Sequence, residues 1–266
     1  MKKITKVLAL VIIALIGLVL SGCKQKDVNE LEVIKKRGKL IVGTSPDYPP
    51  YEFIDIDTGE VIGFDIEIAK EIAKDLGVEL EIKEMAFSGL LAALTTGNVD
   101  IVLAGMTPTP ERQLSVDFSD IYYTAVQALI VHKDNQDVIT SLADLAGKTI
   151  GVQKGTIQAE IAAEIEGATV RELGKITDLV MELKFKNVDA LIVELPVAES
   201  YVANNNDLFL TSITFDEVDG GSAVAVKKNS PELLAEINKT LKRLMDENLI
   251  DKFVTDATNK VNADEE

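Results

Sequence analysis

Residues 64–83 read FDIEIAKEIAKDLGVELEIK and hold a predicted helix followed directly by a strand. Apolar side chains at 64, 68, 69, 72, 73 and 76 recur at the spacing of one helix face, which predicts a helix over Phe64–Leu76. Gly77 is expected to end this helix, because glycine accepts the left-handed conformation of a helix cap. Val78–Lys83 is the predicted strand.

The same alternation extends on both sides of this stretch. Before it, Leu40–Gly43 is a predicted strand, and Phe53–Gly63 is a predicted hairpin that turns at Asp57–Gly59. After it, Ser88–Thr96 is a predicted helix and Val99–Ala104 a predicted strand. Alternating strands and helices predict an α/β fold with largely parallel sheets.

A second cycle of elements begins after Asp144. It comprises the predicted strand Thr149–Val152, the helices Thr156–Ile165 and Ile176–Phe185, and the strand Ala190–Val193. Within it, NVDALI at 187–192 echoes NVDIVL at 98–103, 89 residues earlier. Each copy follows a predicted helix and begins a predicted strand, which indicates two lobes whose helices and strands are connected in a similar order.

The chain is expected to pass between the two lobes twice. Ala125–His132 and Gly221–Lys227 are extended, apolar segments that bracket the second cycle, and Pro231–Phe253 is predicted to be helical and to return to the first lobe. The predicted architecture has two mostly parallel sheets joined by two hinge strands. Lobe 1 covers residues 36–125 and 221–266, and lobe 2 covers 126–220. A cleft between hinged lobes is a natural place for a ligand.

The N-terminal segment is predicted to be a signal peptide, residues 1–22. Three lysines precede an apolar run of 14 residues at 7–20, whereas a helix needs about 20 residues to span a bilayer. Leu20-Ser21-Gly22-Cys23 resembles the bacterial lipoprotein box, and Cys23 is the only cysteine. We expect a diacylated Cys23 as the mature N-terminus, anchored in the membrane, with residues 23–35 as a tether. An uncleaved membrane anchor is the alternative.

The formal net charge is −17, and loss of the leader would remove three lysines and no acids. A surface this acidic argues against nucleic-acid binding, which needs clustered lysine and arginine. The charge would also concentrate cationic solutes near the protein, although solubility alone accounts for it equally well.

Candidate binding residues follow the predicted strands, because ligands of open α/β sheets bind beyond the carboxyl ends of the strands. Thr109 and Pro110 form a good helix start after Val99–Ala104, and Arg112 behind them suits a carboxylate, since a guanidinium grips both oxygens. The alternative is an ordinary capped helix with a solvated arginine.

The second lobe offers a turn and a carboxylate at the corresponding places. Gly151–Thr156 ends a predicted strand and opens a helix, and Glu194 ends another strand, where it would suit an ammonium group. Three aromatic residues, Tyr48, Tyr51 and Phe87, occupy loops that would face the cleft. They could sandwich a flat or cationic side chain. A surface glutamate and ordinary core aromatics are the alternatives.

Four motifs together resemble one known family. They are YPPYEF at 48–53, GFDIEIA at 63–69, TPTPER at 107–112 with VDFS at 116–119, and GVQKGT at 151–156. In this order, over Leu40–Phe253, they resemble the family 3 solute-binding proteins of polar amino-acid ABC importers. The resemblance implies a two-lobed periplasmic-binding-protein fold of type II that closes on one free amino acid outside the cytoplasmic membrane. It also implies delivery of that amino acid to an ABC importer permease.

The resemblance also implies roles for individual residues. Arg112 and Thr107 would hold the α-carboxylate, with Gly105 and Thr156 nearby, and Glu194 stands where the family usually has an aspartate for the α-ammonium. Ser45 stands where some members carry an aspartate for basic side chains. A polar or cationic ligand is expected, such as arginine, glutamine, lysine or histidine. The full expected ligand-binding set is Tyr48, Tyr51, Phe87, Ala104, Gly105, Thr107, Arg112, Gln153, Thr156, Ile157 and Glu194.

Two other functions compete with transport. An enzyme is disfavoured, because His132 is the only histidine, and no cluster of residues indicates a metal site or a cofactor. Some relatives of the fold are dehydratases that need only an acid in the cleft, a role that Glu194 would fit. A ligand sensor on the same scaffold would bind the same solute, and only the missing permease would distinguish it. Transport without catalytic residues is the prediction.

Overall fold

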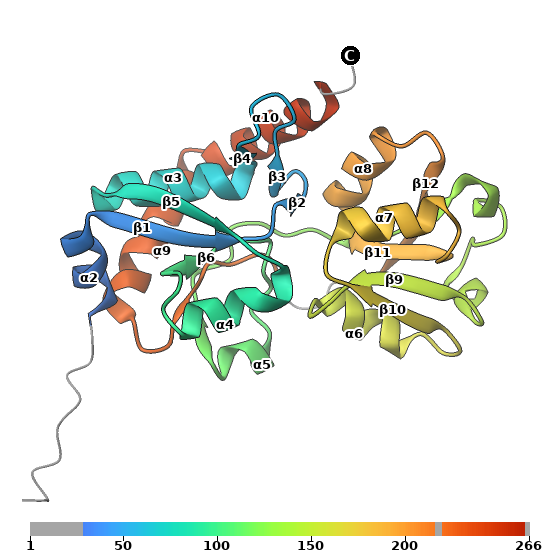
Figure 1. Cartoon of the computed structure of the whole chain (residues 1–266), viewed down its shortest axis with the longest axis horizontal. Helices are drawn as coiled ribbons and strands as arrows, with labels where there is room; N and C mark the ends of the chain where they lie inside the picture. The colour runs from blue at the N-terminus through green and yellow to red at the C-terminus, as the bar shows by residue number, and fades with distance from the viewer. Residues whose placement is uncertain (1–28, 216–219, 264–266) are drawn as a thin grey trace, which may run out of the picture.

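The computed structural model describes residues 29–215 and 220–263 and has two lobes that lie side by side (Figure 1). The predicted signal peptide and Cys23 lie outside the described residues, as do residues 216–219, which precede the second predicted crossover. Among the helices in the described ranges, none is long and apolar enough to cross a membrane.

Lobe 1 is built on a five-stranded sheet in the order β5-β1-β6-β13-β7. Its strands are β1 (Lys39–Thr44), β5 (Glu79–Glu84), β6 (Ile101–Val102), β7 (Val116–Phe118) and β13 (Ala225–Lys227). β1 pairs in parallel with β5 and β6, whereas β13 pairs antiparallel with β6 and β7. Four strands therefore share one direction, which confirms the mostly parallel sheet.

Helices and a small second sheet complete lobe 1. The helices are α2 (Glu30–Arg37), α3 (Phe64–Leu76), α4 (Leu90–Thr95), α5 (Pro110–Gln113), α9 (Pro231–Asp246) and α10 (Leu249–Ala263), with a 3₁₀ turn η1 (Phe87–Gly89) before α4. The small sheet has the order β2 (Asp47–Tyr48), β3 (Glu52–Ile54), β4 (Val61–Ile62), and it contains the predicted hairpin. α3 has the predicted bounds, and Gly77 caps it at φ 71°.

Lobe 2 repeats the arrangement with the order β10-β9-β11-β8-β12. Its strands are β8 (Gln127–His132), β9 (Thr149–Gln153), β10 (Thr169–Leu173), β11 (Ala190–Glu194) and β12 (Leu208–Phe215). Its helices are α6 (Ile157–Glu164), α7 (Ile176–Lys184) and α8 (Leu195–Ala203), with 3₁₀ turns η2 (Lys133–Asn135) and η3 (Leu142–Leu145). β9 pairs in parallel with β10 and β11, and β8 is the strand that runs against the rest.

The crossovers are shorter than the sequence predicts. β8 lies in the sheet of lobe 2 and takes up six of the eight residues of the first predicted hinge strand. β13 lies in the sheet of lobe 1 and takes up the last three of the seven residues of the second. The two connections touch at an isolated antiparallel bridge between Tyr123 and Ser222. There the Ser222 amide donates to the Tyr123 carbonyl at 2.7 Å. This bridge marks the hinge between the lobes.

The predicted bounds differ from the structure most clearly in three places. The strand predicted at Val99–Ala104 shortens to β6, because the chain turns into the cavity loop after Val102. The helix predicted over Pro231–Phe253 is two helices that break at Asn248, which has φ 52°. Residues 30–35, assigned to the tether, lie in α2, whose Ile34 is fully buried.

Two strands of lobe 2 were not predicted. β10 is an edge strand with mostly exposed side chains, and β12 is the other edge strand of the sheet. Edge strands need only one paired side and one packed face, so their sequences look less like buried strands than β9 or β11 do.

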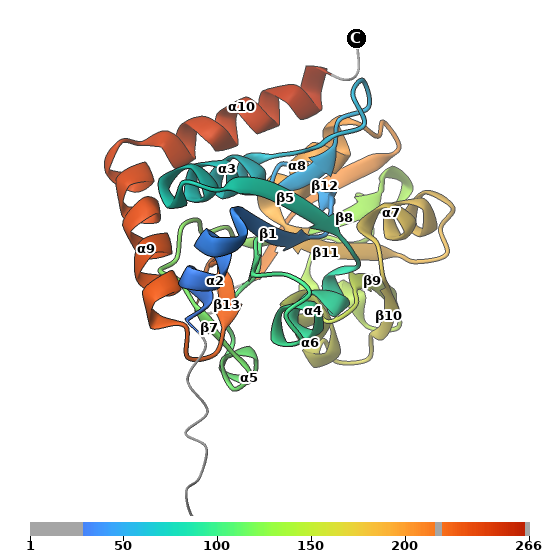
Figure 2. The same cartoon turned by 60° about the vertical axis from the view of Figure 1, so that its left-hand side comes forward.

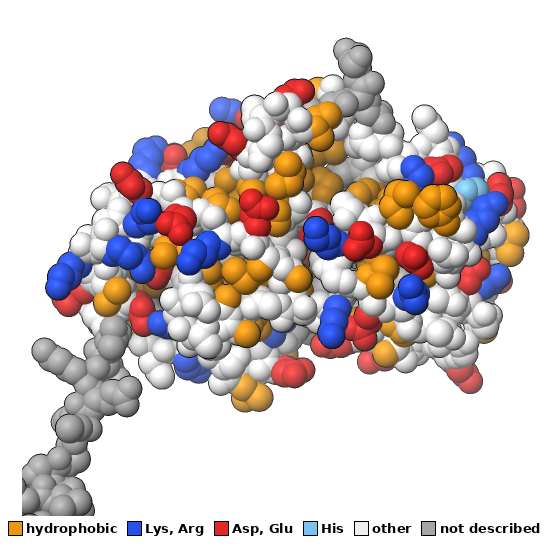
Figure 3. Space-filling view, in the orientation of Figure 1, with side chains coloured by type: hydrophobic (Ala, Val, Ile, Leu, Met, Phe, Trp, Pro, Cys, Tyr) orange, Lys and Arg blue, Asp and Glu red, His pale blue; other side chains and the backbone are white. Residues whose placement is uncertain are grey.

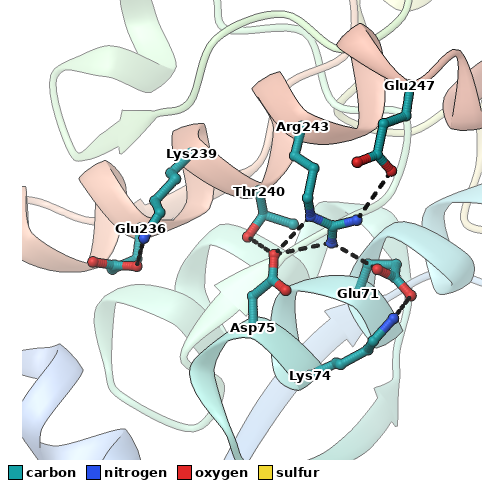
Figure 4. A network of polar contacts seen from close by, with 8 residues as sticks. All are labelled: Glu71, Lys74, Asp75, Glu236, Lys239, Thr240, Arg243 and Glu247. Atoms are coloured by element: carbon teal, nitrogen blue, oxygen red, sulfur yellow. Dashed lines mark hydrogen bonds and ion pairs between the residues drawn. The ribbon is translucent and has the colours of Figure 1, made fainter.

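The C-terminal helices tie the end of the chain to lobe 1. α10 runs along α3 (Figure 2), and α9 joins α3 through the ionic network shown in Figure 4. Arg243 of α9 donates to Glu71 at 2.6 Å and to Asp75 at 2.9 Å, and it pairs with Glu247 at 3.7 Å. The network holds α9, which belongs to the C-terminal segment of lobe 1, against α3.

On the face shown in Figure 3, acidic and basic side chains are interspersed over both lobes. The net charge of −17 is therefore not gathered into one patch on this face.

Candidate ligand-binding site between the lobes

A cavity of about 320 Å³, a volume that includes open solvent at its mouth, lies where the two lobes meet. Its lining comprises Tyr48, Glu52, Phe87, Ala104, Gly105, Thr107 and Arg112 from lobe 1, and Gln153, Thr156, Ile157, Gln158 and Glu194 from lobe 2. Ten of the eleven predicted ligand-binding residues are in this lining, and Tyr51 is not. The structure thus brings the predicted set together, while its role in binding stays a prediction.

The carboxyl ends of three strands deliver these residues. The loop after β6 supplies Ala104 to Thr107, the turn after β9 supplies Thr156, and β11 ends on Glu194. Gly105 has φ 54°, and a β-carbon there would lie 3.3 Å from the Tyr51 ring. Glycine at this position therefore permits both the left-handed backbone and the close approach of the ring.

Arg112 is held at the edge of the cavity by carbonyl groups from both lobes. Its Nη1 donates to the Thr107 carbonyl at 2.6 Å, and its Nη2 donates to the Gly155 carbonyl at 3.0 Å. The guanidinium also lies over the Phe87 ring, 5.4 Å from its centre. Burial lowers the pKa of Arg112 from its usual value. These bonds use two of the five N–H donors of a guanidinium, which leaves others for an anion.

The helix that carries Arg112 starts as predicted. Thr109 caps α5, because its hydroxyl accepts a hydrogen bond from the Arg112 amide at 3.3 Å, and Pro110 occupies the first turn. The cap fixes the backbone of Arg112 only five residues after the Thr107 carbonyl that its side chain contacts.

Glu194 lies opposite, on the lobe 2 side, and is buried. Its carboxylate accepts hydrogen bonds from the Tyr51 hydroxyl and the Gln127 amide, and its backbone amide donates to the Tyr48 hydroxyl at 3.1 Å. Burial raises the pKa of Glu194 to about 8, although the two side-chain bonds act in the other direction. A buried acid of this kind gains most from a cationic partner.

Tyr51 does not form part of the aromatic wall that the sequence predicts. Its ring is fully buried below the cavity, against Phe64 at 4.3 Å and Tyr123 at 5.7 Å between ring centres. Its hydroxyl instead holds Glu194. Tyr48 and Phe87 remain as the aromatic lining.

Glu52 and Gln158 line the cavity and were missed. Glu52 is buried in β3, and in the sequence it stands between two aromatic residues. A glutamate at a position expected to be buried suggests a functional role, and this was the signal in the sequence that could have identified it. Gln158 is the second residue of α6, close to the predicted turn.

Asp65 of α3 lies behind the cavity and stabilises the loop that contains the lining residue Gly105. It accepts hydrogen bonds from the Gly105 amide at 2.9 Å, from the Tyr122 hydroxyl at 2.8 Å and from the Glu52 carboxyl group. Burial raises the pKa of Asp65 to about 7, and it raises the pKa of Glu52 well above its usual value, with the Asp65 charge adding to the shift.

Two α/β lobes of equal strand order that close over a cavity at their strand ends define a two-lobed solute-binding protein. Residues 40–256 match the model of the bacterial extracellular solute-binding proteins, family 3, and the chain belongs to this family.

Named relatives agree with this assignment. The chain is 44% identical to the arginine-binding extracellular protein ArtP of Bacillus subtilis, with 93% of this chain and 96% of the relative covered. It is 34% identical to a probable histidine-binding protein of Campylobacter jejuni, with 87% and 90% covered.

A solved structure shares the fold at high similarity. The amino acid ABC transporter substrate-binding protein AbpA of Streptococcus pneumoniae, bound to L-arginine, has a TM-score of 0.84 and 40% identity, covering 86% of this chain and 98% of that one. The predicted class, a solute-binding component of amino-acid import rather than an enzyme, is confirmed.

Proposed function

We propose that this chain binds a free amino acid with a polar or cationic side chain, arginine first, and hands it to the permease of an ABC importer. One observation carries the proposal: Arg112 and Glu194, from opposite lobes, line the same buried cavity. Such a pair suits the α-carboxylate and α-ammonium groups of one amino acid. Arginine is placed first because a relative that is 44% identical is named as arginine-binding, and a solved structure that is 40% identical has L-arginine bound.

Closure of the lobes on a ligand would follow from the placement of Arg112 and Glu194 on different lobes. Each lobe offers one charge to the ligand, so an amino acid that bridges Arg112 and Glu194 stabilises the closed arrangement over the open one. The Tyr123–Ser222 bridge is a narrow connection about which the lobes could rotate.

Calorimetry of the purified protein tests the proposal. Arginine, glutamine, lysine and histidine are titrated in parallel, with leucine as the apolar reference. Tight binding of at least one of the four supports the function. Tight binding of leucine, with none of the four detectable, would overturn it.

We further propose that Cys23 is lipidated and anchors the protein on the outer side of the cytoplasmic membrane. The LSGC sequence after a short apolar run supports the anchor, and Cys23 is the only thiol. Intact-mass measurement should show a diacylated Cys23 as the first residue, and Cys23→Ala should release the protein from membranes. An unmodified Cys23 behind an uncleaved leader contradicts the anchor.

A further inference from the structure

Asp47 of β2 connects the two lobes at a place outside the cavity. Two of the hydrogen bonds between the lobes join residues that do not line the cavity, and both end on Asp47 of lobe 1. The Ile176 amide of α7 donates to the Asp47 Oδ2 atom at 2.7 Å, and the Tyr201 hydroxyl of α8 donates to the Asp47 carbonyl at 2.8 Å. One residue of lobe 1 thus contacts two helices of lobe 2.

Helix α7 has no capping side chain of its own. Its N-cap residue is Lys175, whose side chain makes no hydrogen bond to the helix. A lysine ammonium group only donates hydrogen bonds, and its charge opposes the positive end of the helix dipole. The side chain that accepts the first amide of α7 is instead the carboxylate of Asp47. Asp47 therefore caps this helix from the opposite lobe.

Asp47 is also held in place by its own lobe. The Ser45 hydroxyl donates to the Asp47 Oδ1 atom at 3.0 Å, and the Asp47 amide donates to the Ser45 carbonyl at 2.8 Å. Burial raises the pKa of Asp47, while the bonds from Ile176, Ser45 and Gln153 and the charge of Lys175 act to lower it. Because the acceptor is already held within lobe 1, little side-chain freedom is lost when α7 packs against it.

The cap can be removed without moving the cavity lining. Gln153, which lines the cavity, donates its side-chain amide to the Asp47 Oδ2 atom at 3.2 Å and to the Gly174 carbonyl at 3.2 Å. The Gly174 bond lies within lobe 2 and holds the amide in the same direction as the Asp47 bond does. Loss of the Asp47 carboxylate is therefore expected to leave the orientation of Gln153 unchanged.

We propose that Asp47 is a positioning residue that caps α7 only when the lobes are closed, and that it thereby strengthens the binding of every amino acid without selecting among them. The inference rests on the proposed amino-acid-binding function. A contact that stabilises the closed state raises the affinity of each ligand that requires closure by the same factor. The contact forms after the ligand has entered, so it acts mainly on the rate of dissociation.

Asp47→Ala tests the cap. Loss of a side-chain acceptor at a helix N-terminus should weaken arginine binding by about 2- to 30-fold. Calorimetry with arginine, lysine, histidine and glutamine should show the same factor for each ligand that the parent binds, so that the affinity ratios stay at their parent values. Stopped-flow measurement of tyrosine fluorescence, in a chain without tryptophan, should show faster dissociation of arginine and little change in its association rate.

Tyr201→Phe tests the same connection from the side of lobe 2. The change removes the hydroxyl that donates to the Asp47 carbonyl and keeps the aromatic ring. Tyr201 lies in α8 and does not line the cavity, so neither the ligand site nor the Asp47 carboxylate is altered. Loss of this one neutral hydrogen bond should weaken arginine binding by about 2- to 10-fold, again through faster dissociation.

Asp144→Ala is the matched control, because Asp144 caps a helical turn within one lobe. It accepts the Thr140 amide at 3.0 Å and the Ser141 amide at 2.9 Å at the start of η3. Its loss should lower the melting temperature of the protein and leave both the arginine affinity and the dissociation rate at their parent values. A purely structural role of Asp47 would give this same result in Asp47→Ala.

The outcomes are distinct from those of the proposed function. If the parent protein binds no amino acid, the proposed function fails. If it binds arginine but Asp47→Ala keeps the parent dissociation rate, only the role of Asp47 in closure fails. The inference also fails if Asp47→Ala changes the affinity ratio of cationic to neutral ligands, or if Asp144→Ala speeds dissociation equally. Should Asp47→Ala not fold, an unchanged dissociation rate in Tyr201→Phe overturns the inference.

Discussion

The two lobes have the same strand order but contribute different kinds of side chain to the cavity. In each sheet the fourth strand runs against the others and is the strand that follows a crossover: β13 in lobe 1 and β8 in lobe 2. Lobe 1 adds the small β2-β3-β4 sheet and the helices α9 and α10, whereas lobe 2 carries no counterpart of either among the described residues.

The difference at the cavity is one of charge. Lobe 1 supplies Arg112 and the aromatic lining of Tyr48 and Phe87, and lobe 2 supplies Glu194 and both glutamines. The proposed partners of the two ends of a zwitterion, Arg112 and Glu194, come from different lobes. The comparison shows two lobes of the same strand order that line one cavity with different side chains, and the following changes test the contribution of each lobe.

Removing the charge of lobe 1 should have the largest effect. Arg112→Ala should weaken arginine binding by roughly 30-fold to several thousand-fold, since truncating one partner of a buried charge pair costs about 2–5 kcal/mol. Arg112→Lys should be almost as weak, because a point charge cannot make the two-pronged contact. Calorimetry measures both variants.

The melting temperature of the empty protein is the control for Arg112. It should change little, because the Thr107 and Gly155 carbonyls that Arg112 contacts lie at the cavity edge, where water can replace it. Binding within tenfold of the parent would show that Arg112 is not the carboxylate anchor.

The charge of lobe 2 should make binding depend on pH. The ligand ammonium needs an ionised Glu194, whose pKa is about 8 in the empty protein. Affinity should therefore rise by up to about tenfold per pH unit from pH 6 to 8, as the proton no longer has to be displaced. Glu194→Gln should bind weakly and largely lose this slope. An equal slope in that variant would assign the titration elsewhere, with Asp65 as the next candidate.

The same buried acids should make the empty protein less stable at higher pH. Burial raises the pKa of Glu194 from 4.5 to about 8 and that of Asp65 from 3.8 to about 7, so the folded state keeps protons that the unfolded chain has released. The free energy of unfolding should fall between pH 5 and 8, by at most about 1.4 kcal/mol per pH unit for each group. Urea unfolding at several pH values measures it, and a rise over this range would contradict the buried protons.

The extra helices of lobe 1 should matter least, and only for stability. Arg243→Ala removes the contacts to Glu71, Asp75 and Glu247, and we expect a loss of about 1 kcal/mol or less, because the guanidinium is partly solvated. Lys239→Ala on the same helix is the matched control, since its pair with Glu236 is exposed. Arginine affinity should stay at the parent value in both. A change in affinity for Arg243→Ala would show that the two regions are coupled.

Local sequence patterns determined the bounds of individual helices and most of the candidate site residues. The periodicity of Phe64–Leu76 and the glycine after it set both ends of α3, because an amphipathic face and a left-handed cap are properties of neighbouring residues. Likewise, ten of the eleven residues predicted to bind the ligand are among the twelve that line the cavity.

Contacts between distant residues were decided only by the tertiary structure. Tyr51 donates its hydroxyl to Glu194, 143 residues away, and Gln153 donates its side-chain amide to Asp47, 106 residues away. Neither leaves a local signal, because a hydrogen bond between lobes depends on how the sheets close and not on the spacing of side chains along the chain. The sequence by itself therefore identified most of the residues that reach the cavity, and the packing of the two lobes decided the rest, with Glu52 and Gln158 in the lining and Tyr51 below it.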